Sequence, residues 1–164
     1  MALTLDHIDK AILRELQEDA SISNLDLSKK IGLSPSACLA RTKNLVEGGV
    51  IQKIAAIVDE KKLGMEILAF ALVNLTPLNR DTIHSFLEDV KKLPQVQECY
   101  TLTGSHDYLL KIVAKDMASY RDFMIDSLMQ NAAISRVETS MVMGIEKRTV
   151  NVPIDEDEWS ALHE

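Results

Sequence analysis

Apolar residues near the N-terminus recur at the spacing of one helix face. Five residues follow this spacing: Leu5, Ile8, Ile12, Leu13 and Leu16. Asp6 and Asp9 stand near the start of the run, where acidic residues are common in the first turn of a helix. The pattern therefore predicts an amphipathic helix from Asp6 to about Gln17, with one apolar stripe to bury.

Two shorter helices with clear terminal signals are predicted in the stretch 23–49. Ser23 caps the first helix and Gly32 ends it. Ser34 caps the second helix, and Pro35 fills its first position, where a missing N–H costs nothing. Two capped helices across a glycine-containing turn are typical of a helix-turn-helix, which lays its second helix in the DNA major groove.

The three predicted helices together form a compact head. We expect five apolar residues to meet in its core: Leu16, Leu27, Ile31, Cys38 and Leu45. Thr42 lies on the same inward face, and its hydroxyl should donate to a backbone carbonyl in the preceding turn. The other side chains of the second helix of the motif are then predicted to face outward.

Positive charge gathers on this motif, although the whole chain carries a net charge of −7. Between residues 29 and 53, five basic residues stand against one acidic residue, which gives a local charge of +4. The acidic total argues against non-specific adhesion to nucleic acid. The local excess of positive charge favours a specific interface with double-stranded DNA.

The predicted DNA-binding residues are Lys29, Lys30, Ser34, Ser36, Ala37, Ala40, Arg41, Lys43 and Asn44. Arg41 is the leading candidate for a contact with guanine or with the DNA backbone. Several of the other side chains are short, so selectivity is expected to rest partly on thymine methyl groups and on DNA shape. The alternative is an ordinary solvated helix face, since Lys43 and Glu47 also make an i,i+4 pair.

The second half of the chain alternates strand-like and helical runs. The strand-like runs are Leu68 to Thr76, Val96 to Thr103, Tyr108 to Lys115 and Ile134 to Thr149. The helical runs are Asp81 to Leu93 and Met117 to Gln130. The order βαββαβ is the ferredoxin-like arrangement, an antiparallel sheet with two helices on one face. The uncovered face of such a sheet predicts a homodimer formed by sheet or edge pairing.

The predicted fold class is α+β, with a winged helix-turn-helix head of three helices at residues 1–49 and a ferredoxin-like domain at residues 67–150. Residues 50–66 join them, and Val50 to Val58 is expected to form a strand because its residues are β-branched or small. Residues 151–164 form an acidic C-terminal tail with Trp159, the only tryptophan. Two conformations of this tail are compatible with its sequence, a short capped helix and a disordered end.

The composition indicates a soluble globular protein. The chain is 46% hydrophobic, yet no apolar run approaches the roughly 20 residues of a membrane helix. The N-terminus lacks a basic region followed by an apolar core, so we expect a cytoplasmic protein. Cys38 and Cys99 lie far apart and the four histidines are scattered, without the spacing of metal ligands. We therefore expect neither a metal nor a cofactor.

The motifs of the two halves together resemble those of the Lrp/AsnC family of transcriptional regulators. In the head they are Ser-Asn-x-x-Leu-Ser-Lys at 23–29 and Gly-Leu-Ser-Pro-Ser-x-Cys-Leu at 32–39. In the second half they are Gly-Ser-His-Asp-Tyr-Leu-Leu-Lys at 104–111 and Thr-Ser-Met-Val-Met at 139–143. The resemblance, which extends from Asp6 to about Thr149, implies dimers that assemble into tetramers or octamers. It also implies small effectors, usually amino acids, bound between subunits of the C-terminal domain.

An amino-acid effector needs donors for its carboxylate and an anion for its ammonium group. The Gly104 and Ser105 N–H groups and the Asp107 carboxylate are able to supply both. The effector-binding residues implied by the resemblance are Gly104, Ser105, His106, Asp107, Met117, Thr139, Ser140 and Met141, with 139–141 from a neighbouring subunit. Alternatively, the loop residues only shape a hairpin and the two methionines belong to the core.

Three functions are compatible with the sequence. The leading one is a sequence-specific DNA-binding regulator whose effector is an amino acid. A siroheme-decarboxylase-like enzyme shares the architecture, but the sequence has no catalytic triad, carboxylate pair, Walker loop or clustered histidines and arginines in its second half. A DNA architectural protein without an effector has the same fold.

Overall fold

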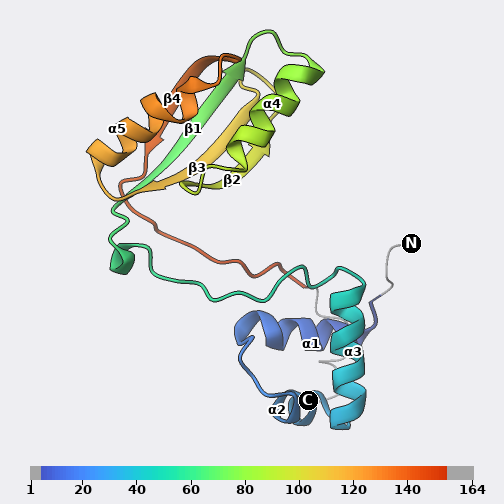
Figure 1. Ribbon diagram of the computed structural model, residues 1–164. Coiled ribbons are helices and arrows are strands. Elements are labelled where there is room, and N and C mark those ends of the chain that lie inside the picture. The colour runs from blue at the N-terminus through green and yellow to red at the C-terminus, as the bar shows by residue number, and fades with distance from the viewer. Residues whose placement is uncertain (1–4, 155–164) are drawn as a thin grey trace. The chain divides into compact units, whose positions relative to one another are not determined.

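The computed structural model describes residues 5–154 of the chain (Figure 1). The helices are α1 (His7–Glu18), α2 (Asn24–Ile31), α3 (Pro35–Glu47), α4 (Arg80–Val90) and α5 (Met117–Asp126), with short 3-10 helices η1 (Lys61–Leu63) and η2 (Leu128–Gln130). The strands are β1 (Ile67–Leu75), β2 (Val96–Thr101), β3 (Tyr108–Ala114) and β4 (Ile134–Met141). The chain divides into two compact units, Met1–Ile57 with Lys147–Glu164, and Val58–Glu146. We call the first unit the head and the second the sheet unit.

Helices α2 and α3 begin at their predicted capping residues, and Asp6 caps α1. Asp6, Ser23 and Ser34 each accept a backbone hydrogen bond at the start of α1, α2 and α3. Gly32 ends α2 with a φ of 72°, in the left-handed region where a side chain causes strain. The predicted helix-turn-helix is confirmed.

One cluster of apolar side chains holds the three helices together. Its buried members are Ile12, Leu13, Leu27, Cys38 and Leu45, and Leu16 and Ile31 pack against them. All five predicted core residues therefore belong to this cluster. The Thr42 hydroxyl donates to the Cys38 carbonyl oxygen at 3.0 Å, as predicted.

The segment from Lys147 returns to the head and contacts α1. The Val152 N–H donates to Gln17 Oε1 at 2.6 Å, and Gln17 Nε2 donates to the Val152 carbonyl oxygen at 3.1 Å. Ile154 packs against the apolar core of the head. The sheet unit is therefore inserted between two parts of the chain that together form the head. The rest of the predicted acidic tail, including Trp159, lies outside the described residues.

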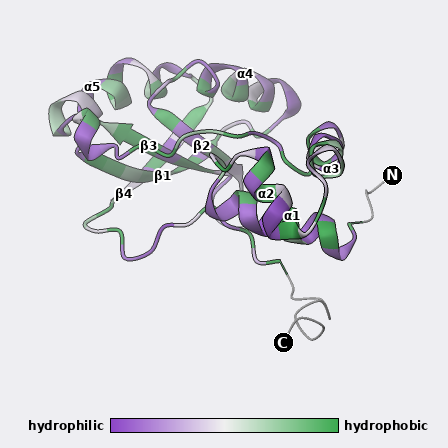
Figure 2. Ribbon diagram, turned by 90° about the horizontal axis from the view of Figure 1, so that it is seen from below, coloured by the Kyte–Doolittle hydropathy of each residue, from purple (hydrophilic) through white to green (hydrophobic). Residues whose placement is uncertain are grey.

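The sheet unit has the predicted βαββαβ order. Its strands form one antiparallel sheet in the order β2-β3-β1-β4, and α4 and α5 cover one face (Figure 1). β1 and β3, the two central strands, are mainly apolar, whereas the helices combine apolar and polar residues (Figure 2). Alternate residues of β1 are buried in the core of this unit: Ala69, Ala71, Val73 and Leu75. Leu68, Phe70 and Leu72 lie on the opposite face and stay partly exposed.

Two predicted strands differ from the structure. Residues 52–59 belong to no helix or strand, so the strand predicted at Val50 to Val58 is wrong. The last strand ends at Met141 and not at Thr149, because Met141 pairs with Ala69, near the beginning of β1. Alternating and β-branched residues favour an extended backbone, but a strand also needs a partner whose N–H and C=O groups complete its hydrogen bonds.

Phe86 of α4 tests the packing of the sheet unit. Its side chain is 0% exposed, and its ring centroid lies 4.7 Å from that of Tyr108. We expect Phe86→Ala to lower the free energy of unfolding by about 3–5 kcal/mol, measured by urea denaturation. Ser85→Ala, at the exposed neighbouring position, should change it by less than about 0.5 kcal/mol. A loss below about 1 kcal/mol for Phe86→Ala contradicts this packing.

Candidate nucleic-acid interface and ligand site

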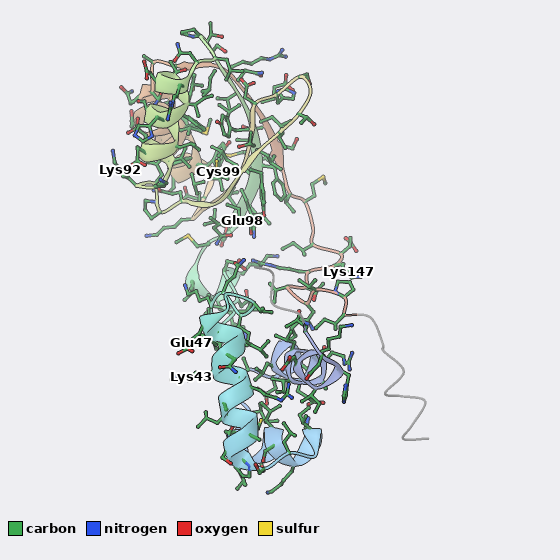
Figure 3. All side chains as sticks on the ribbon, turned by 90° about the vertical axis from the view of Figure 1, so that its right-hand side faces the viewer. Lys43, Glu47, Lys92, Glu98, Cys99 and Lys147 are labelled. Carbon is green, nitrogen blue, oxygen red and sulfur yellow. The ribbon has the colours of Figure 1, made fainter. Side chains whose placement is uncertain are left out.

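The outward surface of α3 lies opposite its buried residues. Five of the predicted DNA-binding residues are exposed there: Ser36, Ala37, Ala40, Lys43 and Asn44. The Lys43 side chain is 70% exposed, and its Nζ lies 3.5 Å from Glu47 Oε1, which makes a weak surface pair. Figure 3 shows Lys43 and Glu47 on the same side of α3. The surface thus combines short side chains near the start of the helix with a cation further along.

Three other predicted DNA-binding residues take part in the fold of the head. The Ser34 hydroxyl caps α3. Lys30 Nζ lies 2.6 Å from Glu15 Oε2 on α1, and Lys29 Nζ lies 3.3 Å from Asp26 Oδ1 on its own helix. The hydrogen bond to Glu15 raises the pKa of Lys30. Both lysine side chains are more than half exposed, so each is able to exchange its carboxylate partner for a phosphate.

Arg41 was predicted to face outward, but its guanidinium group bonds to α1 and its side chain is 34% exposed. Its Nη1 donates to Asp6 Oδ2 at 2.8 Å and to Asp9 Oδ1 at 2.9 Å, both in the first turn of α1. These hydrogen bonds raise the pKa of Arg41. Arg41 stands three residues after the buried Cys38 and four before the buried Leu45, which places it at the margin of the inward face.

Leu39 is a candidate DNA contact that sequence reasoning missed. Its side chain is 57% exposed on α3. Its exposure follows from the helical period, because it stands one residue, or about 100°, from the buried Cys38. A leucine on the exposed surface of this helix is suited to contact a thymine methyl group.

Asn74 holds the loop 104–107 against the end of β1. Asn74 Nδ2 donates to the Ser105 carbonyl oxygen at 2.8 Å, and Asn74 Oδ1 lies 3.0 Å from His106 Nδ1. His106 is 18% exposed, and its Nε2 lies 3.9 Å from Glu138 Oε2. Sequence reasoning missed Asn74, although an amide inside an apolar strand is a signal that its side chain has a polar partner.

Asp107 fastens the same loop through its carboxylate. Asp107 Oδ2 accepts a hydrogen bond from the Leu75 N–H at 2.8 Å, and the Asp107 N–H donates to the Val73 carbonyl oxygen at 3.0 Å. Gly104 has a φ of 110°, a backbone conformation that favours glycine. These contacts support the alternative in which Gly104 and Asp107 shape the hairpin. The Asp107 carboxylate has a second oxygen, Oδ1, that is able to accept a further donor.

Thr139, Ser140 and Met141 follow one another on β4 and face alternate sides of the sheet. Thr139 faces the helices, and its Oγ1 lies 2.7 Å from the Tyr120 hydroxyl oxygen. Ser140 pairs with Phe70 and lies on the open face. Within one chain, these three predicted residues therefore do not line one pocket.

Met117 and Met141 lie at the far end of the sheet from the loop 104–107. Met117 begins α5 shortly after β3, whose last residue pairs with Ile67, and Met141 pairs with Ala69. The loop is bonded to the other end of β1. A strand of nine residues is about 26 Å long. A site that uses both the loop and these methionines therefore draws on two copies of the chain.

Residues 5–154, the described part of the chain, contain neither a metal-binding cluster nor a membrane-spanning helix. In this part of the chain, His, Cys, Asp and Glu side chains form no group of three or more that could hold a metal ion. Over the same residues, no helix combines the length and apolar character needed to cross a membrane.

A helix-turn-helix head joined to a ferredoxin-like sheet is the architecture of a two-domain DNA-binding regulator, and the comparisons with known proteins agree with this class. Residues 5–52 match the family model for a winged helix-turn-helix DNA-binding domain, and residues 68–152 match the Lrp/AsnC ligand binding domain. The chain belongs to the Lrp/AsnC family of transcriptional regulators. It is therefore a transcriptional regulator and not an enzyme, which sets aside the siroheme-decarboxylase alternative.

Relatives of known class match nearly the whole chain. It is 78% identical over 156 residues to the transcriptional regulator AzlB of Bacillus subtilis (strain 168), covering 95% of this chain and 99% of AzlB. It is 39% identical over 139 residues to the leucine-responsive regulatory protein of Escherichia coli (strain K12), covering 85% of each. A transcriptional regulator of Neisseria meningitidis, solved in complex with L-Met, superposes with a TM-score of 0.87 at 34% identity, over 92% of this chain and 97% of that one.

Asn74→Ala tests how the loop 104–107 is held. The substitution removes both hydrogen bonds of the Asn74 side chain to the loop. We expect the Asp107 amide, which bonds to Val73, to exchange its hydrogen at least about tenfold faster, because losing such bonds costs more than about 1 kcal/mol. Thr103→Ala, at an exposed neighbouring position, should leave this rate unchanged. Equal exchange in the parent protein and Asn74→Ala contradicts this role of Asn74.

Proposed function

We propose that this regulator binds specific double-stranded DNA through the outward surface of α3, and that its effector is an amino acid bound by an oligomer of the sheet unit. The observation that carries the proposal is the row of exposed residues on α3. This row lies on the side of α3 away from the core and consists of short side chains together with Leu39 and Lys43. A protein of this kind acts on the chromosome, in the cytoplasm.

DNA recognition by α3 follows from the docking geometry of a helix-turn-helix. The N-terminal part of its second helix meets the base edges, and short side chains there let the helix approach closely. Lys43 and the two lysines of α2 are suited to phosphate contacts that set the register on the duplex. The proposed DNA-binding residues are Lys29, Lys30, Ser36, Ala37, Leu39, Ala40, Lys43 and Asn44.

The open face of the sheet supports a homodimer. Leu68, Phe70 and Leu72 of β1 lie there partly exposed, and Leu72 pairs with Leu109 of β3. A contiguous apolar surface of this kind is normally covered by a partner. The two heads of a dimer then read half-sites about 34–36 Å apart or a multiple of that distance. Further assembly gives tetramers or octamers.

The loop 104–107 is suited to an amino acid. The Gly104 and Ser105 N–H groups offer donors for the carboxylate, and Asp107 Oδ1 offers an acceptor for the ammonium group. Met117 and Met141 of a second copy would contact the effector side chain, since within one chain they lie at the far end of the sheet. The L-Met complex of the related Neisseria meningitidis regulator supports an amino acid as the class of effector.

Lys43→Ala tests the DNA-binding surface. Because Lys43 is an exposed cation on α3, its removal should make the plot of log affinity against log salt concentration shallower by about one. The probe is a duplex selected from a random library by the parent protein, and the readout is fluorescence anisotropy. Lys91→Ala is the matched control, since Lys91 is also 70% exposed but lies at the end of α4. An unchanged slope for Lys43→Ala rules out the proposed role of α3.

Asp107→Asn tests the effector site. Asparagine keeps an oxygen for the Leu75 N–H but loses the charge that would bind an ammonium group. In a panel of twenty amino acids, an effector at about 100 times its Kd should stabilise the parent by about 2.7 kcal/mol, several degrees of melting temperature.

We expect Asp107→Asn to lose this shift while keeping the parent melting temperature without effector. Asp122→Asn, at an exposed position on α5, should respond as the parent does. A panel in which no amino acid raises the melting temperature of the parent contradicts the effector proposal. It favours instead a DNA architectural protein that responds to no effector.

A further inference from the structure

The first turn of α1 contains a closed pair of hydrogen bonds between two aspartates. The Asp9 N–H donates to Asp6 Oδ1 at 2.8 Å, and the Asp6 N–H donates to Asp9 Oδ2 at 3.3 Å. This capping box holds both carboxylates against the backbone of α1. One oxygen of each carboxylate remains available to another donor.

Arg41 of α3 donates to those two oxygens. Its Nη1 lies 2.8 Å from Asp6 Oδ2 and 2.9 Å from Asp9 Oδ1. Each of the four carboxylate oxygens thus accepts an N–H, two from the backbone of α1 and two from Arg41. The network joins the beginning of α1 to the middle of α3.

Partial burial distinguishes this network from the surface ion pairs of the head. The side chains of Asp9, Arg41 and Asp6 are 14%, 34% and 44% exposed, whereas those of Lys43 and Glu47 are 70% and 62% exposed. The capping box already restrains both carboxylates, so the ion pair costs less side-chain entropy than a pair of free side chains. Burial raises the pKa of Asp6, but hydrogen bonds from the Asp9 N–H and from Arg41 outweigh it, and the net shift is downward.

The two carboxylates outweigh the charge of the arginine. Asp6, Asp9 and Arg41 together carry a net charge of −1, so the cluster as a whole repels a DNA phosphate. Arg41 is therefore poorly placed to neutralise the DNA backbone. Its contacts instead restrict how α3 can rotate and slide against α1.

We propose that Arg41 is a positioning residue, which through Asp6 and Asp9 sets the orientation of α3 on α1 and with it the selectivity of α3 for DNA sequence. The inference rests on the proposed binding of DNA by α3. Contacts to base edges depend on the orientation of the helix, whereas the attraction of phosphates does not. Loosening α3 should therefore reduce selectivity more than general affinity for DNA.

Three variants test the network. Arg41→Met keeps the aliphatic stem and removes the donors. The double variant Asp6→Asn with Asp9→Asn keeps an oxygen for each capping bond but turns an amide towards Arg41. The third variant combines all three substitutions. The affinity of each is measured for the selected duplex and for a scrambled duplex of the same composition, at a temperature where thermal melts show every variant folded.

We expect Arg41→Met and the double variant each to lower the ratio of the two affinities by about tenfold, the cost of one misread base pair. The triple variant should be no less selective than Arg41→Met, because all three substitutions disrupt one network. Arg41→Met should keep the salt dependence of the parent protein. If Arg41→Met does not fold, Arg41→Lys replaces it and should show reduced selectivity, because one ammonium group replaces the planar donor group.

Opposite results would overturn the proposal. If Arg41→Met makes the salt plot shallower by about one, Arg41 contacts phosphate directly. Full selectivity in Arg41→Met also contradicts the positioning role. Lys43→Ala distinguishes failure of the proposed DNA binding by α3 from failure of the positioning role of Arg41. Its salt dependence reports DNA binding by α3 independently of Arg41.

Discussion

Burial of one side of α3 is the constraint on which the head depends. Cys38 and Leu45 are 0% and 1% exposed and pack with residues of α1 and α2. Because residues three and four apart lie on the same side of a helix, burying these two decides which neighbours meet water. The apolar contacts that stabilise the head therefore also select the surface that α3 presents. Arg41 lies at the margin between the two sides, where a charged side chain finds partners on α1.

In β1, burial likewise decides which side chains are exposed, but here the buried and exposed residues alternate one by one. Ala69 and Ala71 are fully buried on the helix-covered side, whereas Phe70 between them lies on the open face. One face of the sheet is thus completed within the chain and the other is not. The open face supports the proposed homodimer, and an effector site shared between copies agrees with the distance between the loop 104–107 and the far end of the sheet.

The chain passes between the two units twice. The head contains both the residues before Val58 and the segment from Lys147, and the sheet unit lies between them in sequence. Gln17 fastens the returning segment with two hydrogen bonds to the backbone of Val152. Two covalent segments therefore link the sheet unit to the head, and the second is attached to α1, the helix that also binds Arg41.

Local signals in the sequence were enough to predict the capped helices, the core of the head and the βαββαβ order, because caps and hydrophobic periods act over a few residues. They did not predict that Val50 to Val58 forms no strand, because a pattern of β-branched residues carries no information about a pairing partner. The contacts of Arg41 with Asp6 and Asp9, and of Asn74 with Ser105, join residues 31 to 35 positions apart. Only the tertiary structure decides such contacts, because packing of the apolar faces brings those side chains together.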